Sequence, residues 1–141
     1  LRRSRGLGDV YKRQAYHVVR NKKRKIYHTN VMMSIGDKLC VVCLDSVDDI
    51  NQKKNLIDNI SDSNTILEIN EEQMDNFAGN IIFLKSKKNE TQIVMSDRAF
   101  RSLKNKQLKT FEKTGNIIKS PIPKIENYSG GSIRCMIAEI F

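Results

Sequence analysis

The sequence predicts an α/β fold made of two ββαβ units, with one extra strand at each end. Three observations lead to this prediction. Apolar segments of strand length occur in pairs around short polar turns, each pair is followed by a segment with the helical spacing of apolar residues, and the same order occurs twice. With 141 residues, of which 39% are hydrophobic, the chain is large enough for one domain with a core.

The first unit is expected within residues 15–69. The dipeptide Gly36–Asp37 lies between two apolar segments and predicts a hairpin turn. Acidic residues precede a segment whose apolar side chains share one face, which predicts a helix packed on the sheet. The expected elements are strands at 15–19, 25–28, 30–35, 38–47 and 65–69, a solvated basic turn at 20–25, and a helix at 48–61 with Ile50, Leu56, Ile57 and Ile60 on its apolar face.

The second unit repeats this order. A polar turn divides the apolar residues of 80–95 into a hairpin, and the hydroxyl of Ser96 can cap the helix that begins at Asp97. A further helical segment ends at Gly115, a residue type favoured directly after a helix. The expected elements are a hairpin at 80–95, helices at 97–103 and 106–115, a strand at 116–122 that is broken by Pro121 and Pro123, and a final strand at 133–141.

Two such units leave sheet edges and apolar faces uncovered. Repeated units of this kind bury a continuous core by packing against neighbours, and more than two are usually needed. We therefore expect that further units precede this segment.

The net charge of +9 is concentrated at one end of the chain. Residues 1–25 hold ten of the 25 basic residues and one of the 16 acidic ones, whereas the remainder carries 15 of each sign. The folded part is therefore not expected to have a basic surface for nucleic acid. The basic run Arg20–Lys25 also lacks interleaved aromatic residues for base stacking, so no nucleic-acid partner is predicted.

Residues 1–14, LRRSRGLGDVYKRQ, show neither helical nor strand periodicity and lack the apolar run of a signal peptide. They are interpreted as a disordered tail translated from adapter or vector sequence, so the folded part is expected at 15–141. The alternative is a basic arm that binds anions, with an affinity for nucleic acid that falls with salt. No apolar run approaches the length of a membrane span, so no membrane partner is predicted.

Three cysteines, an odd number, without a secretory signal favour free thiols and a reducing cytoplasm. Cys40 and Cys43 form a C-x-x-C pair, but the surrounding residues predict a strand, on which positions three apart point to opposite faces. The sequence has no second C-x-x-C to complete a zinc site. We expect both to be core residues, with no metal and no cofactor.

The third cysteine, Cys135, has a different sequence context. It follows the glycine pair Gly130–Gly131, and glycine allows a backbone to approach a ligand closely. A cysteine with a histidine elsewhere in the chain is a candidate nucleophile with its acid/base, and His28 lies at a predicted strand edge in YHTN. Cys135 and His28 are therefore the candidate catalytic pair.

Three segments of the chain resemble the guanidino-group-modifying enzymes, or penteins, which include arginine deiminases, dimethylarginine hydrolases and amidinotransferases. The segments are YHTNVMMSIGDKLCVVCLDS, EQMDNFAGN and GGSIRCMIAEIF. The last looks like the Gly-Gly-x-x-Arg-Cys-Met ending of an arginine deiminase. The resemblance runs from about residue 15 to residue 141 and is closest to bacterial proteins described as arginine-deiminase-related or citrulline ureidase proteins.

The resemblance implies a five-bladed α/β propeller of ββαβ modules around a polar central site. The chain would then be the C-terminal part of the catalytic domain, a partial propeller of about two modules. The acidic site residues of the family lie in the N-terminal modules, so we expect this fragment to be inactive alone.

The resemblance also implies roles for individual residues. Cys135 would be the nucleophile and His28 the general acid/base, in a reaction that passes through a covalent intermediate. Arg134 and a protonated His28 are the cations available to stabilise the thiolate, and Arg134 is a second candidate for binding a substrate carboxylate. The glycines Gly130 and Gly131 and the inner-rim residue Asn80 are further candidates for substrate binding.

One candidate differs from the family pattern. Many relatives have an aspartate two positions after the histidine, which binds the substrate cation, whereas this chain has Asn30. A neutral amide pairs poorly with a buried guanidinium but can hydrogen-bond a neutral ureido group. Asn30 therefore favours a citrulline-like substrate over an arginine-like one.

The sequence thus predicts a cytoplasmic hydrolase of a guanidino or ureido C–N bond, with a small arginine- or citrulline-like molecule as its partner. Two alternatives remain open. An amidinotransferase would use the same cysteine and pass the group to an amine, and a non-catalytic binding domain would act through the basic arm.

Overall fold

The computed structural model of the protein describes residues 16–19 and 22–138. The predicted tail, residues 1–14, lies outside the described residues. The strands are β1 Tyr16–Val19, β2 Lys22–Lys25, β3 Met33–Ile35, β4 Leu39–Val42, β5 Thr65–Glu68, β6 Ile82–Lys85, β7 Thr91–Ser96 and β8 Asn116–Ser120. The α-helices are α2 Ile50–Ser61, α3 Glu71–Asp75, α4 Asp97–Ser102, α5 Asn105–Thr114 and α6 Pro123–Ser129, and the 3₁₀ helices are η1 Thr29–Val31, η2 Leu44–Ser46 and η3 Ile133–Met136.

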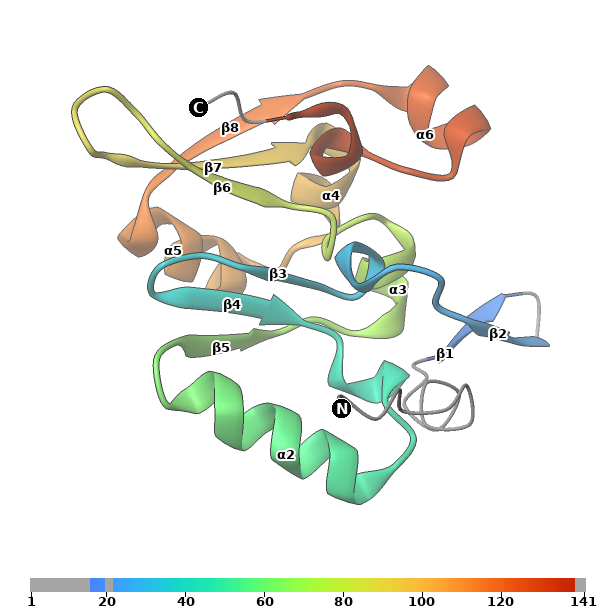
Figure 1. The fold of residues 1–141 in the computed structure, drawn as a ribbon. Coiled ribbons are helices and arrows are strands. Elements are labelled where there is room, and N and C mark those ends of the chain that lie inside the picture. The colour runs from blue at the N-terminus through green and yellow to red at the C-terminus, as the bar shows by residue number, and fades with distance from the viewer. Residues whose placement is uncertain (1–15, 20–21, 139–141) are drawn as a thin grey trace, which may run out of the picture.

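The first module is a three-stranded sheet in the order β3-β4-β5 (Figure 1). β3 and β4 form an antiparallel hairpin, α2 follows, and β5 returns parallel to β4. Asp49 begins α2 because its side chain accepts hydrogen bonds from the backbone N–H groups of Asn51 and Gln52, at 2.9 and 3.0 Å. The strand-strand-helix-strand order predicted for this segment is confirmed.

The second module repeats the arrangement with the sheet order β6-β7-β8. β6 and β7 are antiparallel, and β8 pairs in parallel with β7 after α4 and α5. Ser96 caps α4 as predicted, since its hydroxyl accepts a hydrogen bond from the backbone N–H of Ala99 at 3.1 Å. The described residues form a mixed α/β structure of two ββαβ modules and the small β1–β2 ribbon; a closed propeller is not shown.

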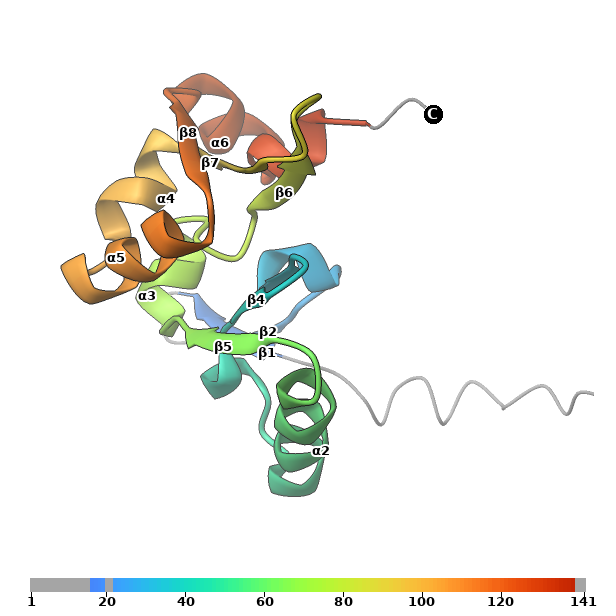
Figure 2. The same ribbon diagram turned by 90° about the vertical axis from the view of Figure 1, so that its left-hand side faces the viewer.

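The two modules lie side by side, with α2 at one end of the molecule and β8 with α6 at the other (Figures 1 and 2). One apolar core extends through both, from the fully buried Cys40, Val41 and Val42 of β4 to Ile93 of β7 and Phe111 of α5. None of the described helices is long and apolar enough to cross a membrane.

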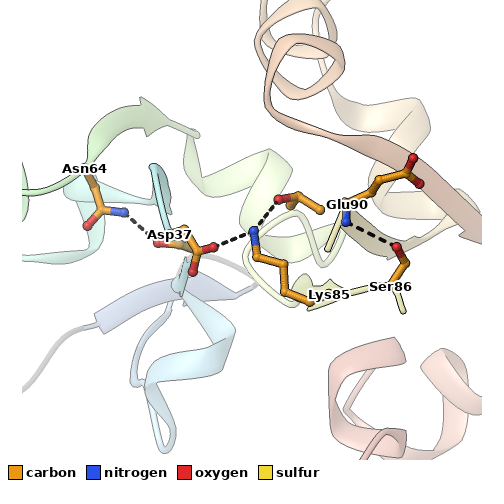
Figure 3. Close-up of polar contacts among 7 residues, drawn as sticks. Asp37, Asn64, Lys85, Ser86 and Glu90 are labelled. Carbon is orange, nitrogen blue, oxygen red and sulfur yellow. Dashed lines mark hydrogen bonds and ion pairs between the residues drawn. The ribbon is translucent and has the colours of Figure 1, made fainter. Parts of the chain in front are cut away.

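Two polar contacts join the modules near β3 and β6. The buried hydroxyl of Ser34 donates to the carbonyl of Gly79 at 2.5 Å and accepts from the N–H of Ile81 at 3.2 Å. At the tip of the β3–β4 hairpin, the ammonium group of Lys85 forms an ion pair of 2.7 Å with Asp37 (Figure 3). Asn64, also drawn there, donates to the carbonyl of Gly36 at 2.6 Å and so holds the same hairpin turn.

Four details of the first unit differ from the predictions. The described part of the predicted basic turn, Lys22–Lys25, forms strand β2, and the strand expected at 25–28 is wrong beyond Lys25. The hairpin turn lies one residue later than predicted, at 37–38, since the N–H of Gly36 bonds to the carbonyl of Leu39. Ile50, the first residue of α2, is 72% exposed, so it is not part of the buried face predicted for this helix.

Three predictions near the site were incomplete or wrong. Helix α3 was missed because it is one short turn, held by a capping box between Asn70 and Gln73. Helix α6 was missed because Pro123 was interpreted as a strand breaker, although proline is favoured in the first turn of a helix. The final strand predicted at 133–141 is wrong for its first residues, Ile133–Met136, which form η3; residues 139–141 lie outside the description.

Candidate active site

The candidate site is built around Cys135, which η3 carries at the surface. Its sulfur accepts hydrogen bonds from two side-chain amides, that of Asn80 at 3.3 Å and that of Asn30 at 3.5 Å. The backbone N–H of Cys135 donates to the carbonyl of Ser132 at 3.0 Å, which closes the 3₁₀ turn. The thiol is therefore exposed to solvent on one side and held by two N–H donors on the other.

The other two cysteines lie in a different environment. Cys40 and Cys43 are free, as predicted, and both are fully buried in the core. Burial raises the pKa of Cys40 to about 11, and burial likewise raises the pKa of Cys43. Cys43 lies just after β4, so the predicted strand ends one residue before it. Both thiols remain protonated at neutral pH.

His28 lies directly before η1 and is exposed. Its Nδ1 accepts a hydrogen bond from the backbone N–H of Asn30 at 3.3 Å, which makes the imidazole the cap of this short helix. Asn30 therefore connects the two predicted catalytic residues: its backbone binds the imidazole of His28 and its side chain binds the sulfur of Cys135.

The predicted catalytic pairing of His28 with Cys135 remains a prediction. His28 borders a hollow of about 680 Å³ between the η1 segment and α2. Asn80 and Gly130 border a smaller hollow of about 190 Å³, and Tyr27 borders both. Tyr27 was not predicted as a site residue; its hydroxyl donates to the carbonyl of Gly130 at 3.1 Å and thereby joins the η1 segment to the end of α6.

Positions 130 and 131 favour glycine for two different structural reasons. Gly130 ends α6 in the left-handed conformation, with φ of 69°, which an L side chain adopts only with strain. Gly131 lies against the nucleophile candidate, since a Cβ at this position would be 3.1 Å from the sulfur of Cys135. The N–H of Gly131 donates to the hydroxyl of Ser129 at 3.3 Å, so this donor is already engaged within the loop.

Arg134 contributes its backbone to the site. Its N–H donates to the side-chain oxygen of Asn80 at 3.1 Å, and its side chain is half-buried. Within the described part of the chain, no ion pair involves its guanidinium. The predicted roles of Arg134 toward the thiolate or a substrate carboxylate therefore remain predictions.

A buried carboxylate supports the loop that carries Cys135. Glu126 of α6 is 6% exposed and accepts a hydrogen bond of 2.7 Å from the hydroxyl of Ser132, which is fully buried. The carbonyl of the same serine binds the N–H of Cys135. Sequence reasoning missed this pair, because one acidic residue six positions before a serine gives no recognisable pattern.

The described residues include no group of three or more His, Cys, Asp and Glu side chains arranged to hold a metal ion. What the structure brings together is an exposed thiol, two carboxamides and, through one of them, an imidazole. A thiol with N–H donors on its sulfur is suited to nucleophilic attack. The part of His28 in proton transfer remains a prediction.

The comparisons with known proteins confirm the pentein superfamily, whereas the closeness to bacterial arginine-deiminase-related or citrulline ureidase proteins remains a prediction. Residues 5–141 match the family described as N,N dimethylarginine dimethylhydrolase, eukaryotic. The match begins within the segment 1–14 that the sequence analysis sets apart, and that boundary remains a prediction. No curated protein matches the chain. Since the family match spans nearly the whole chain, the protein belongs to the N,N-dimethylarginine dimethylhydrolase family, within the pentein superfamily of guanidino-group-modifying enzymes.

Proposed function

We propose that the protein hydrolyses a C–N bond of a guanidino or ureido group on a small arginine- or citrulline-like substrate, with Cys135 as nucleophile and His28 as general acid/base. The observation that carries the proposal is the pair of amide N–H donors on the sulfur of an exposed cysteine. Hydrogen bonds of this kind stabilise negative charge on sulfur, and the thiolate is the attacking form of cysteine.

The chemistry proceeds in two stages. The sulfur of Cys135 bonds to the central carbon of the substrate group, and the C–N bond to the departing nitrogen breaks as His28 donates a proton to that nitrogen. Ammonia or an amine leaves, and the rest of the group stays bonded to sulfur. His28 then accepts a proton from water, the hydroxide attacks the same carbon, and the C–S bond breaks to restore the thiolate.

Asn30 supports a preference for a neutral group. Its side chain carries no charge, so it cannot offset the positive charge of a guanidinium, whereas its amide can hydrogen-bond a ureido group. Its amide nitrogen already binds the sulfur of Cys135, which places it directly beside the reacting atom. The family description names dimethylarginine, a guanidinium compound, and this is therefore the competing substrate class.

Because the chain is expected to be inactive alone, the first test is to incubate the longer protein, with the modules expected before this segment, separately with dimethylarginine, arginine and citrulline, in parallel with the chain itself. Dimethylamine, ammonia and ornithine are then measured by NMR, and a covalent adduct on Cys135 is sought by acid quench and intact-mass spectrometry. The proposal expects product or adduct with at least one substrate and neither in the Cys135→Ala variant, while the buried Cys40→Ala variant retains both. An added amine that becomes part of the product would instead identify an amidinotransferase.

A second test does not depend on turnover. 2-Chloroacetamidine and 2-chloroacetamide alkylate thiols alike but differ in charge, so the ratio of their rates at Cys135 reports the charge preference of the site. Asn30→Asp should raise the amidine rate relative to the amide rate by about tenfold, since one partly buried ion pair contributes on the order of 1 kcal/mol or more. An unchanged ratio would mean that position 30 does not select substrate charge.

A further inference from the structure

The backbone around Asn80 is fixed on both sides by one buried hydroxyl. Ser34 donates to the carbonyl of Gly79 at 2.5 Å and accepts from the N–H of Ile81 at 3.2 Å, so the residues before and after Asn80 share a single anchor. The backbone N–H of Asn80 itself donates to the carbonyl of Phe77 at 2.9 Å. The backbone at position 80, between α3 and β6, is therefore held by hydrogen bonds at the residue itself and at both of its neighbours.

The side chain of Asn80 is 3% exposed and its amide is fully engaged. Both hydrogens of its nitrogen have acceptors, the carbonyl of Asn30 at 3.2 Å and the sulfur of Cys135 at 3.3 Å. Its oxygen accepts from the N–H of Arg134 at 3.1 Å. An amide in this state has no donor left for a substrate, which differs from the substrate-binding role that the sequence predicts.

We infer that Asn80 is a positioning residue for Cys135, a role that rests on the proposed function of that cysteine. One N–H of the amide holds the sulfur and favours its negatively charged form, both before attack and when the C–S bond breaks. The other contacts fix η3 through Arg134 and η1 through Asn30, so a single buried side chain sets the spacing of the elements that carry the site.

Asn30 is the second donor to the same sulfur but is less constrained. Its contact is longer, 3.5 Å against 3.3 Å, and its side chain is half-buried whereas that of Asn80 is buried. Asn80 also holds Asn30 in place through the backbone carbonyl of that residue. The order of importance expected for the thiolate is therefore Asn80 before Asn30.

The test is the rate at which iodoacetamide alkylates Cys135, measured against pH by mass spectrometry of the peptide. Asn80→Asp keeps the size and the acceptor oxygen for Arg134, removes both N–H donors and adds a negative charge beside the sulfur, so the uncharged Asn80→Ser variant separates the lost hydrogen bond from the added charge. The rate at pH 7 should fall about 10- to 100-fold, because a hydrogen bond to a charged group is lost, and the pH–rate profile should move to higher pH. Asn30→Asp should cause the same change to a smaller degree.

The matched control is Asn76→Asp, four residues earlier, which removes a donor to the carbonyl of Glu72 and keeps the acceptor for Arg98. It should leave the rate within about twofold. Asn80→Ser, which is too short to reach the sulfur, should repeat the loss, and circular dichroism establishes that each variant is folded.

A structural role alone would give a different result. If folded Asn80→Asp or Asn80→Ser variants react as fast as the unchanged chain, or faster, with the same pH–rate profile, the inference is overturned. Alkylation needs no turnover, so absence of substrate hydrolysis would count against the proposed function while leaving this test valid. Conversely, if substrate is hydrolysed but the pH–rate profile of alkylation is the same in the Asn80 variants as in the unchanged chain, the proposed function stands and the role inferred for Asn80 is rejected.

Discussion

At the scale of single residues, the three cysteines show how the surroundings decide the chemistry of one side-chain type. Cys40 and Cys43 are fully buried, and burial raises the pKa of both, that of Cys40 to about 11. Cys135 is exposed and its sulfur accepts two amide N–H bonds. Reactivity at neutral pH is therefore expected at one of the three positions.

Selective labelling checks this expectation. Iodoacetamide at pH 7.5 should modify Cys135 in the folded chain at least about tenfold faster than Cys40 or Cys43, since thiols that are protonated and buried react slowly. Peptide mass spectrometry over a time course gives the three rates. In 6 M guanidinium chloride the three rates should converge, and equal rates in the folded chain would contradict the assignment of Cys135 as the reactive thiol.

Part of this site could be predicted from the sequence, because a motif identifies candidate residues even when their contacts in the structure are unknown. Cys135, Asn30 and Asn80 were all selected from segments that resemble the penteins, and the structure brings these three together. The bond from Tyr27 to Gly130 could not be predicted, because its partners are 103 positions apart and a single hydrogen bond leaves no periodic signal. The role of Asn80 also needed the structure, since burial and bonding partners are not visible in a motif.

At the scale of elements, hydrophobic periodicity predicted the parts that the core determines. β4 is buried along its whole length, and α2 and β5 follow from the same pattern of apolar residues. The pattern failed near the site, where β-branched residues at 133–141 favoured a strand. There the N–H of Arg134 binds the side chain of Asn80, and such tertiary contacts outweigh the weak local preference for a strand.

The end of α6 gives a prediction at this scale. Gly130→Ala should lower the free energy of unfolding by about 1–2 kcal/mol, because a residue with a Cβ is strained at φ of 69°. No atom lies within 4 Å of the added methyl group, so the loss would come from the backbone alone. Urea unfolding followed by circular dichroism measures it. Lys124→Ala, on the exposed surface of the same helix, should change stability by less than about 0.5 kcal/mol, and an equal effect of both substitutions would contradict the strain argument.

At the scale of the whole molecule, the candidate site is divided between the two modules. His28 and Asn30 precede β3 of the first module, whereas Asn80 and Cys135 belong to the second. The spacing between the thiol and the imidazole therefore depends on the junction of the modules. That junction contains a buried contact, at Ser34, and an exposed one, the ion pair of Asp37 and Lys85 (Figure 3).

The two contacts should differ in their contribution to stability. Ser34→Ala leaves the buried carbonyl of Gly79 and N–H of Ile81 without this partner, which should cost about 1–3 kcal/mol in the free energy of unfolding. Asp37→Asn removes an ion pair whose side chains are 66% and 45% exposed, and should cost less than about 1 kcal/mol, with most of the loss absent at high salt. Urea unfolding at low and high salt compares the variants.

Because Ser34 also anchors the residues on both sides of Asn80, its loss should slow alkylation of Cys135 in the folded chain, whereas Asp37→Asn should not. A larger effect of Asp37→Asn in either measurement would mean that the exposed pair, and not the buried hydroxyl, holds the modules and the site together.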